Sequence, residues 1–424
     1  MARFFYALLW YLALPLVLLR LLWRARKQPE YRQNVGERLG FYGQQAELGK
    51  QPVIWVHAVS VGETRAAEPL IRALQAQWPT HTILLTGMTP TGRAAGLSVF
   101  GEAVHQCYLP YDIDFAVNRF FAHFSPAFGV LMETEIWPNL LAGAKKHGVP
   151  VVLVNARLSV RSARGYARFS ALSRPAFASL AAVAAQTAAD ADRLTALGVA
   201  SIEVCGNLKF DVQPPAERLD QGRTWREACA DRAVWLAAST REGEESLLLD
   251  AWLKHPLRER ALLVLVPRHP QRFDEVANLL QRHGVVYMRR SKGWPEPQTQ
   301  VWLGDSMGEM AAYYALSDLA FVGGSLLPLG GQNLIEAAAC ACPVLVGPHT
   351  FNFLRATEDA IEAGAAERVA DATSLISAVD RLLTAKKELA ARRQAASRFA
   401  AAHRGATRRT LALITRYVGR PAGR

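Results

Sequence analysis

The chain has 424 residues, half of them hydrophobic and a fifth charged, and its formal net charge at pH 7 is +12. This length exceeds what one hydrophobic core usually organises, so we expect a globular protein of two domains. The five cysteines are scattered without a CxxC pair, which argues against a zinc or redox site and fits a reduced, cytosolic setting.

The N-terminal segment departs from this soluble pattern. Residues 4–19 are 16 uncharged, mostly apolar residues, at the margin of the about 20 that a spanning helix needs. Arg24, Arg26 and Lys27 follow, and the positive-inside tendency keeps the chain after them in the cytoplasm. We expect residues 1–27 to form an uncleaved membrane anchor that spans the bilayer or lies in its interface. An ordinary buried first helix is the alternative.

The surplus of positive charge gathers behind the anchor, from Arg24 to Arg38, and in the C-terminal stretch from Lys386 to Arg424. This distribution suits anionic lipid headgroups or a phosphorylated lipid, at about 1 kcal/mol per well-placed cation. A nucleic acid is the weaker interpretation, because no zinc-finger spacing, aromatic RNP motif or basic zipper occurs. We therefore expect a membrane surface with anionic lipids as a partner, and no nucleic acid.

Beyond the anchor, apolar runs alternate with helical patterns, which predicts βαβ units and parallel sheets. The strands expected are Val53–Ala58, Thr82–Thr86, Ala127–Met132, Val149–Asn155, Val234–Ala238, Ala261–Val266, Val301–Leu303, Leu319–Val322 and Pro343–Val346. A seam is expected between Phe210 and Gln221, where a Pro-Pro pair interrupts the apolar periodicity. The pattern predicts an α/β protein with two doubly wound domains, residues 28–214 and 215–424.

Polar motifs follow most of these strands, at the end where open parallel sheets bind ligands. They are HAVSVGET (57–64), ETEIWPN (133–139), STREGEE (239–245), PRHPQRF (267–273) and GDSMGEM (304–310). Gly330 and Gly331 precede a helix expected to begin near Asn333. Such a glycine pair leaves backbone N–H groups free to hold a phosphate.

Three of the candidate groups also have ordinary structural explanations. Glu63 suits the first turn of a helix, where a carboxylate is stabilised by the helix dipole. His57 is either an acid–base group or a hydrogen-bonded histidine near a strand end. Asp112 and Asp114 form the DxD spacing of metal-dependent glycosyltransferases, but a helix pattern follows, so we expect Asp114 to cap that helix.

Seven motifs stand here in the order seen in 3-deoxy-D-manno-octulosonic acid (Kdo) transferases: HAVSVGE, ETEIWPN, NARLS, GNLKFD, VPRHPQRF, GDSMGEM and GGQNLIEAAA. The chain resembles this family from the anchor to about residue 370. Its members are inner-membrane enzymes that add Kdo from CMP-Kdo to a lipid A precursor in lipopolysaccharide biosynthesis. The resemblance implies a GT-B fold, in which two Rossmann-like domains face a cleft, with acceptor groups on the N-terminal domain and donor groups on the C-terminal one.

The resemblance also implies roles for individual residues. Glu63 matches the family's proposed general base, and Glu133 and Lys209 match groups that stabilise the transition state. The residues that match CMP-holding segments are Pro267, Arg268, Met307, Gly308, Glu309, Asn333, Leu334, Ile335 and Glu336. No cofactor and no metal are expected, because CMP offers a single phosphate. Gln332 stands where many members have histidine, which leaves the contribution of this position open.

The expected chemistry is the attack of an acceptor hydroxyl on the sugar, with a base taking the proton and cations or dipoles receiving the leaving phosphate. The helix dipole lowers the basicity of Glu63, so desolvation would have to raise it again. Lys209 either neutralises developing charge, holds an acidic substrate group, or pairs at the surface with Asp211 or Glu203.

Two other function classes stay open on the residues alone. A nucleotide-sugar isomerase can share the two-domain architecture, but it gives no reason for a membrane anchor. A membrane-anchored binding protein without catalysis would not need a carboxylate and a lysine facing a phosphate site. The resemblance favours the transferase, at the bacterial inner membrane with its catalytic domains on the cytoplasmic side.

Overall fold

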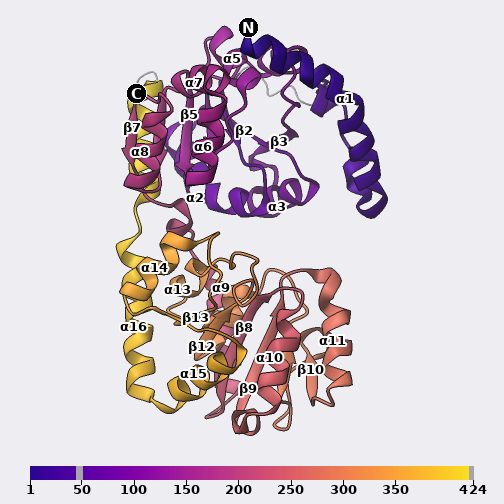
Figure 1. Ribbon diagram of the computed structural model, residues 1–424, viewed down its shortest axis with the longest axis vertical. Helices are drawn as coiled ribbons and strands as arrows, with labels where there is room; N and C mark the ends of the chain where they lie inside the picture. The colour runs from indigo at the N-terminus through magenta and orange to yellow at the C-terminus, as the bar shows by residue number, and fades with distance from the viewer. Residues whose placement is uncertain (44–50, 420–424) are drawn as a thin grey trace. The chain divides into compact units, whose positions relative to one another are not determined.

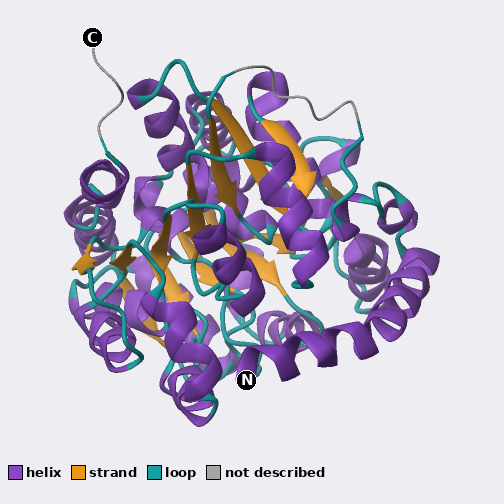
Figure 2. Ribbon diagram, turned by 90° about the horizontal axis from the view of Figure 1, so that it is seen from above, coloured by secondary structure: helices purple, strands orange, loops and turns teal. Residues whose placement is uncertain are grey.

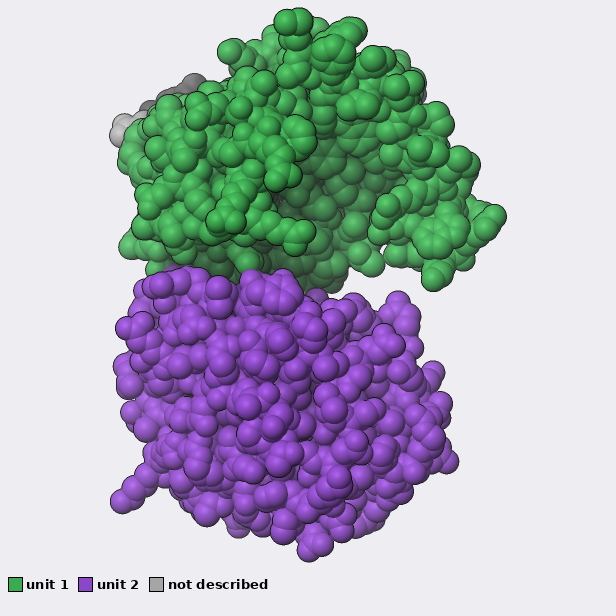
Figure 3. Space-filling model, in the orientation of Figure 1, with its two compact units in different colours: residues 1–212, 404–424 green, residues 213–403 purple. Residues whose placement is uncertain are grey.

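The computed structural model describes residues 1–43 and 51–419 (Figure 1). The chain forms two compact units, which are coloured separately in Figure 3. Unit 1 contains residues 1–212 and the segment from Arg404 onward, and unit 2 contains residues 213–403. The first change of unit therefore falls inside the seam that the sequence predicts. Residues 420–424 of the basic C-terminal stretch lie outside the described residues.

Unit 1 is built on a parallel sheet of seven strands in the order β3-β2-β1-β4-β5-β6-β7. The strands are β1 (Val53–His57), β2 (Thr82–Gly87), β3 (His105–Tyr108), β4 (Phe128–Met132), β5 (Val151–Ala156), β6 (Ala182–Ala185) and β7 (Ile202–Val204). Its helices are α1 (Ala2–Lys27), α2 (Val61–Gln77), α3 (Pro90–Phe100), α4 (Asp114–Phe124), α5 (Pro138–Lys146), α6 (Val160–Arg168), α7 (Ser170–Ala178), α8 (Ala188–Ala196) and α17 (Ala406–Val418).

Helices cover both faces of this sheet, so its central strands are apolar on both sides. Along β1, Trp55 packs into the core formed with α4, α5 and α7, whereas Ile54 and Val56 pack into the core formed with α2 and α17. Figure 2 shows the strands enclosed by helices. This double burial explains why β1 is a continuous apolar run in the sequence.

Unit 2 repeats the plan with seven parallel strands in the order β10-β11-β9-β8-β12-β13-β14. The strands are β8 (Ala233–Thr240), β9 (Ala261–Pro267), β10 (Tyr287–Arg289), β11 (Val301–Leu303), β12 (Leu319–Val322), β13 (Val344–Val346) and β14 (Ala366–Arg368). The helices are α9 (Ala216–Ala228), α10 (Glu244–Leu253), α11 (Phe273–Arg282), α12 (Met310–Leu316), α13 (Ile335–Ala339), α14 (Leu354–Glu362), α15 (Ala372–Thr384) and α16 (Lys386–Ala402).

Each sheet reverses its strand order once. In unit 1 the chain moves outward from β1 in one direction and from β4 in the other, and in unit 2 the same reversal lies between β8 and β12. At such a point the loops that follow the two strands diverge and leave a crevice in which ligands bind. The fold therefore marks one edge of each sheet as a candidate site.

The last helix corrects the predicted domain boundary, because α17 belongs to unit 1 and not to the second domain. Leu413 and Ile414 join the core formed by α2 and β1, and the Asp211 carboxylate accepts hydrogen bonds from the N–H groups of Gly405 (2.7 Å) and Thr407 (2.6 Å). An apolar stripe on a helix does not state which sheet it will cover. The sequence pattern therefore could not reveal this return of the chain.

Candidate functional site

The reversal point of the unit 1 sheet brings the expected catalytic residues onto adjoining elements. His57, the last residue of β1, pairs with Leu131 of β4. Glu63 lies in the first turn of α2, directly after β1, and Glu133 follows β4. Lys209 lies in a short 3-10 helix, Leu208–Asp211, and bonds to Glu133.

Glu63 closes the turn between β1 and α2. One carboxylate oxygen accepts the N–H of Val59 at 2.9 Å, and the other accepts the Ser60 hydroxyl at 3.0 Å. Ser60 caps the helix in return, because its Oγ accepts the N–H of Glu63 at 3.3 Å. Glu63 therefore has the structural role expected of a carboxylate in the first turn of a helix. Its pKa indicates a further role.

The surroundings of Glu63 raise its pKa from 4.5 to about 7. Burial is the largest cause, and the negative charges of Glu133 and Glu135 act in the same direction, whereas the hydrogen bonds from Val59 and Ser60 oppose it. A carboxyl group with a pKa near 7 is poised to accept a proton at neutral pH. The desolvation that the proposed base requires is present.

Glu133 and Lys209 form an ion pair, with Lys209 Nζ 3.0 Å from Glu133 Oε1. Glu133 has a backbone φ of 57°, and this left-handed conformation in a residue other than glycine stores strain of the kind that clusters at functional sites. The surface partners considered for Lys209 are engaged elsewhere: Asp211 caps α17, and Glu203 pairs with Arg416.

Glu135 is a third carboxylate of this site that the sequence analysis did not single out. It lies two residues after Glu133 in ETEIWPN, and Trp137 Nε1 donates a 2.7 Å hydrogen bond to it. Burial raises its pKa, and the Glu133 charge adds to the effect. The sequence could have indicated Glu135 through its spacing from Glu133, because residues i and i+2 of a tight turn can face the same crevice.

His57 is fully buried. Its Nδ1 lies 3.1 Å from the carbonyl oxygen and 2.9 Å from the hydroxyl of Thr86, on the neighbouring strand. Burial lowers its pKa to about 4, so the imidazole is neutral at pH 7. The hydrogen-bonded alternative fits this placement, in which His57 ties β1 to β2.

The DxD pair does not behave as expected. Asp114 is the first residue of α4, and the capping position belongs to Ile113, without a side-chain hydrogen bond, so the predicted cap is wrong. Asp112 instead is fully buried and caps α5, accepting the N–H groups of Asn139 (3.1 Å) and Leu140 (2.7 Å). Among the described residues, no group of three or more His, Cys, Asp or Glu side chains is arranged to hold a metal.

In unit 2 the three expected donor segments follow β9, β11 and β12, of which β9 and β11 are neighbours and β12 is separated from β9 by β8. Pro267 ends β9, and the N–H of Arg268 bonds to the carbonyl oxygen of Thr240, at the end of β8. The segment from Met307 to Glu309 follows β11, and Asn333 to Glu336 follow β12. Burial raises the pKa of the Tyr314 hydroxyl; the Glu336 charge adds to this effect and the Arg268 charge opposes it.

The glycine pair differs from its prediction. Gly330 and Gly331 have positive φ, as expected of a tight turn, but the N–H of Gly331 bonds to Gly324 O (2.7 Å) and that of Gln332 to Gly323 O (2.9 Å). The N–H groups of Gly331 and Gln332 are therefore occupied within the loop and are not free for a phosphate. The sequence could not show that the chain folds back on the glycines that follow β12.

The residues that follow the glycine pair have different hydrogen bonds. Asn333 Oδ1 accepts the N–H of Ile335, the first residue of α13, and its Nδ2 donates to Glu336 Oε1 at 3.1 Å. Within the described part of the chain, the N–H groups of Asn333 and Leu334 have no intramolecular partner. These two amides are where an anion would find backbone donors.

Two of the expected donor residues, Met307 and Glu309, differ in how accessible their side chains are to a ligand. Met307 is 62% exposed, so it is available to a ligand. The Glu309 carboxylate is buried and committed to other side chains, lying 3.0 Å from Arg290 and 3.6 Å from Arg218. Any contact of Glu309 with CMP would therefore come from its backbone.

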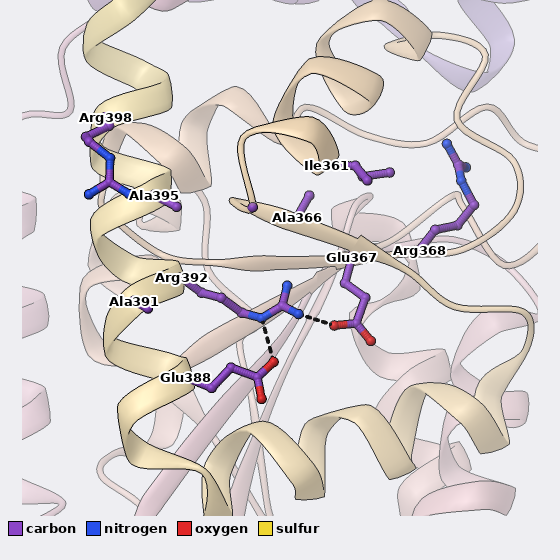
Figure 4. A pocket seen from close by; sticks show the side chains of 10 residues that line it. Ile361, Ala366, Glu367, Arg368, Glu388, Ala391, Arg392, Ala395 and Arg398 are labelled. Atoms are coloured by element: carbon purple, nitrogen blue, oxygen red, sulfur yellow. Dashed lines mark hydrogen bonds and ion pairs between the residues drawn. The ribbon is translucent and has the colours of Figure 1, made fainter.

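Two surface pockets of unit 2 can be compared with the expected donor residues, none of which lines either pocket. The larger, of about 560 Å³, lies against β14 and α16, and Figure 4 shows Arg392 in it bonded to Glu367 and Glu388. None of the expected donor residues lines it. The smaller, of about 310 Å³, includes Thr350 and Phe351, which lie against the glycine pair.

Comparison with known proteins finds relatives that match almost the whole chain. Residues 33–212 match the family described as 3-Deoxy-D-manno-octulosonic-acid transferase (kdotransferase). The chain is similar to the 3-deoxy-D-manno-octulosonic acid transferase of Bordetella pertussis, 45% identical over 96% of this chain and 97% of that protein. It is 39% identical to the enzyme of the same name from Haemophilus influenzae, over 99% of this chain and 100% of that protein.

Solved structures show the fold. A glycosyltransferase from Rickettsia africae aligns with a TM-score of 0.60 at 13% identity, covering 87% of this chain and 99% of that one. A UDP-GlcNAc 2-epimerase from Neisseria meningitidis aligns at 0.59 and 16%, over 86% and 100%. The GT-B architecture is thus confirmed, and epimerases share it. With near full-length identity of 45% and 39% to two Kdo transferases, the chain belongs to the 3-deoxy-D-manno-octulosonic acid transferase family.

Proposed function

We propose that this protein transfers Kdo from CMP-Kdo to a lipid A precursor at the bacterial inner membrane, with Glu63 as the general base of an inverting direct displacement. The observation that carries the mechanism is the carboxyl group of Glu63, at the reversal point of the sheet with a pKa of about 7. Family membership supports Kdo as the transferred group.

The reaction balances with groups on the chain. The acceptor hydroxyl oxygen attacks the anomeric carbon of Kdo, the bond from that carbon to the CMP phosphate oxygen breaks, and its electron pair leaves with CMP. Glu63 takes the hydroxyl proton. Glu133 and Lys209 act as transition-state stabilisers. Glu133 holds Lys209 at 3.0 Å, and the ammonium group of Lys209 can stabilise negative charge that develops in the reaction.

The leaving phosphate gains negative charge and needs donors on unit 2. Arg268 supplies a cation, and the N–H groups of Asn333 and Leu334 supply dipoles, while Pro267, Met307 to Glu309 and Ile335 to Glu336 complete the CMP site. No metal is required by this arrangement, because one phosphate can be held by an arginine and backbone amides.

The membrane part of the proposal rests on α1. Among the described residues, it is the one helix whose length and mean hydropathy of 2.0 suit a bilayer. The cations that follow it favour anionic lipid and keep the catalytic units on the cytoplasmic side.

The proposal is tested with purified protein, a tetraacylated lipid A precursor, and CMP-Kdo generated in the reaction. Release of CMP with a matching increase in the mass of the lipid supports it. Isomerised sugar without a heavier lipid would point to an isomerase, and binding without CMP release would point to a binding protein. Either result refutes the proposal.

A further inference from the structure

Helix α1 has an inner face that is attached to unit 1. Partly buried residues of this face pack against a cluster of Tyr111, Ile113 and Ala116, and they are Trp10, Leu14, Val17 and Leu18. Farther along, Leu21 and Ala25 pack against Tyr31. Spacings of three and four residues place these groups on one stripe of the helix.

A polar contact fixes the same face. The Tyr6 hydroxyl donates a 2.9 Å hydrogen bond to Asp112, which is the carboxylate that caps α5. From Tyr6 to Leu18 the part of α1 that contacts the body of unit 1 measures about 18 Å at 1.5 Å per residue. A hydrocarbon core is about 30 Å thick, so a helix attached over this length to a water-soluble unit has too little left to cross it.

The opposite face is apolar and exposed. Nine large side chains, each at least 45% exposed, form it: Phe4, Phe5, Leu8, Leu9, Leu12, Leu16, Leu19, Leu22 and Trp23. A continuous apolar face of this extent on a globular unit marks an interaction surface. The exposed cations Arg20, Arg24, Arg26 and Lys27 border it.

We propose that α1 lies in the plane of the membrane, with this apolar face inserted into one leaflet that contains anionic lipid, while its inner face stays on unit 1. Lipid is favoured over a protein partner because the cations at the end of the helix match anionic headgroups, as in interfacial helices. The inference deepens the proposed function and rests on it for the lipid nature of the acceptor.

The link through Asp112 gives this placement a consequence for the site. Asp112 joins Tyr6 of α1 to the first turn of α5, and α5 begins directly after the segment that holds Glu133 and Glu135. An embedded α1 therefore holds the acceptor side of unit 1 at the lipid surface. A glycolipid can then reach the carboxylates with its acyl chains still in the leaflet.

The topology is tested by placing a thiol at the N-terminus. The full chain with Ala2→Cys is expressed in a Gram-negative bacterium and treated with a membrane-impermeant maleimide, and the unsubstituted chain controls for its five cysteines. We expect labelling only after the inner membrane is permeabilised. Labelling in intact spheroplasts would place the N-terminus in the periplasm and overturn the proposal.

The inserted face is tested with vesicles of phosphatidylcholine with and without phosphatidylglycerol. Leu12→Glu with Leu16→Glu should lower binding at least about tenfold, whereas Leu247→Glu, on an exposed leucine of α10 in unit 2, should leave it unchanged. Binding should be stronger with phosphatidylglycerol and weaken with salt. Equal binding of the double variant and the parent would refute insertion of this face.

Neither test uses a sugar donor or an acceptor, so each reads the placement of α1 independently of the proposed reaction. A transferase whose N-terminus is periplasmic would contradict the inference and leave the proposed function standing. If α1 lies as proposed but the chain transfers no Kdo, the proposed function fails and the inferred placement of α1 stands.

Discussion

Replacing Glu63 with glutamine isolates the proton-accepting role of this side chain. In the wild type, Glu63 accepts hydrogen bonds from the N–H of Val59 and from the Ser60 hydroxyl. A glutamine can satisfy both partners, because its amide oxygen accepts from Val59 and its NH₂ group donates to Ser60 Oγ. The turn therefore keeps its hydrogen bonds, and only the capacity to take a proton is lost.

The expected loss is a factor of about 10² to 10⁴ in the single-turnover rate, the usual share of a general base. The pKa of about 7 predicts a pH profile as well. Below about pH 7 the wild-type rate should fall tenfold per pH unit as Glu63 is protonated, and the Glu63→Gln rate should lack this dependence.

The free energy of unfolding of the wild type should depend on pH in the direction opposite to its rate: the rate rises, and the stability falls, as Glu63 ionises. The pKa of Glu63 is raised from 4.5 to about 7, so between these values the folded chain binds the proton more tightly than the unfolded chain. Ionisation therefore destabilises the folded state progressively as the pH rises through this window. Glu63→Gln should be at least as stable as the wild type at pH 8, and the advantage should disappear below pH 4.5.

The assay combines calorimetric CMP affinity, thermal unfolding and single-turnover transfer on the same samples. Glu68→Gln is the control, because Glu68 lies on the same helix and pairs with the exposed Arg72. A folded Glu63→Gln protein that transfers Kdo at nearly the wild-type rate would refute the reasoning. The base would then be sought at Glu133 or Glu135.

The remaining predictions concern three other positions. Lys209→Met should lower turnover more than 100-fold while changing the free energy of unfolding by no more than about 1 kcal/mol, since its pair with Glu133 is partly exposed; an unchanged rate would contradict its role. Asp112→Ala should destabilise the chain by about 1 to 2 kcal/mol through loss of the α5 cap, whereas EDTA should leave the wild-type rate unchanged; restoration of a lost rate by a divalent ion would refute metal independence. Asn333→Ala should weaken CMP binding about tenfold, a loss of about 1.4 kcal/mol, by removing the hydrogen bond to Glu336; unchanged affinity in calorimetry would exclude it from the donor site.

The sequence by itself determined the interior of the fold. Every strand that it predicts is present, and these are the central strands, whose residues are buried on both faces and therefore form continuous apolar runs. Five strands escaped prediction. One is β6 (Ala182–Ala185), which is buried but rich in alanine, a residue depleted in strands. The others are the four edge strands β3, β7, β10 and β14. They have three or four residues each and are only partly buried, so hydrophobic periodicity has little to detect in them.

The sequence also determined which residues are candidates for chemistry, because polar motifs after buried strands must gather at one edge of a parallel sheet. Tertiary structure alone decided what each of them contacts. It paired Lys209 with Glu133, brought Glu135 near Glu63, and occupied the N–H group of Gly331, which the sequence analysis expected to be free.

The features that the sequence could least predict are those that depend on contacts between residues far apart in the chain. Nothing local distinguishes a helix that returns to the first sheet, as α17 does, from one that completes the second. Nothing local tells which residues of unit 1 the inner face of α1 will cover. Both depend on contacts between residues about 100 or more positions apart, such as Asp211 with Thr407 and Tyr6 with Asp112. Local pattern encodes which face of an element is apolar, and only packing determines which surface covers it.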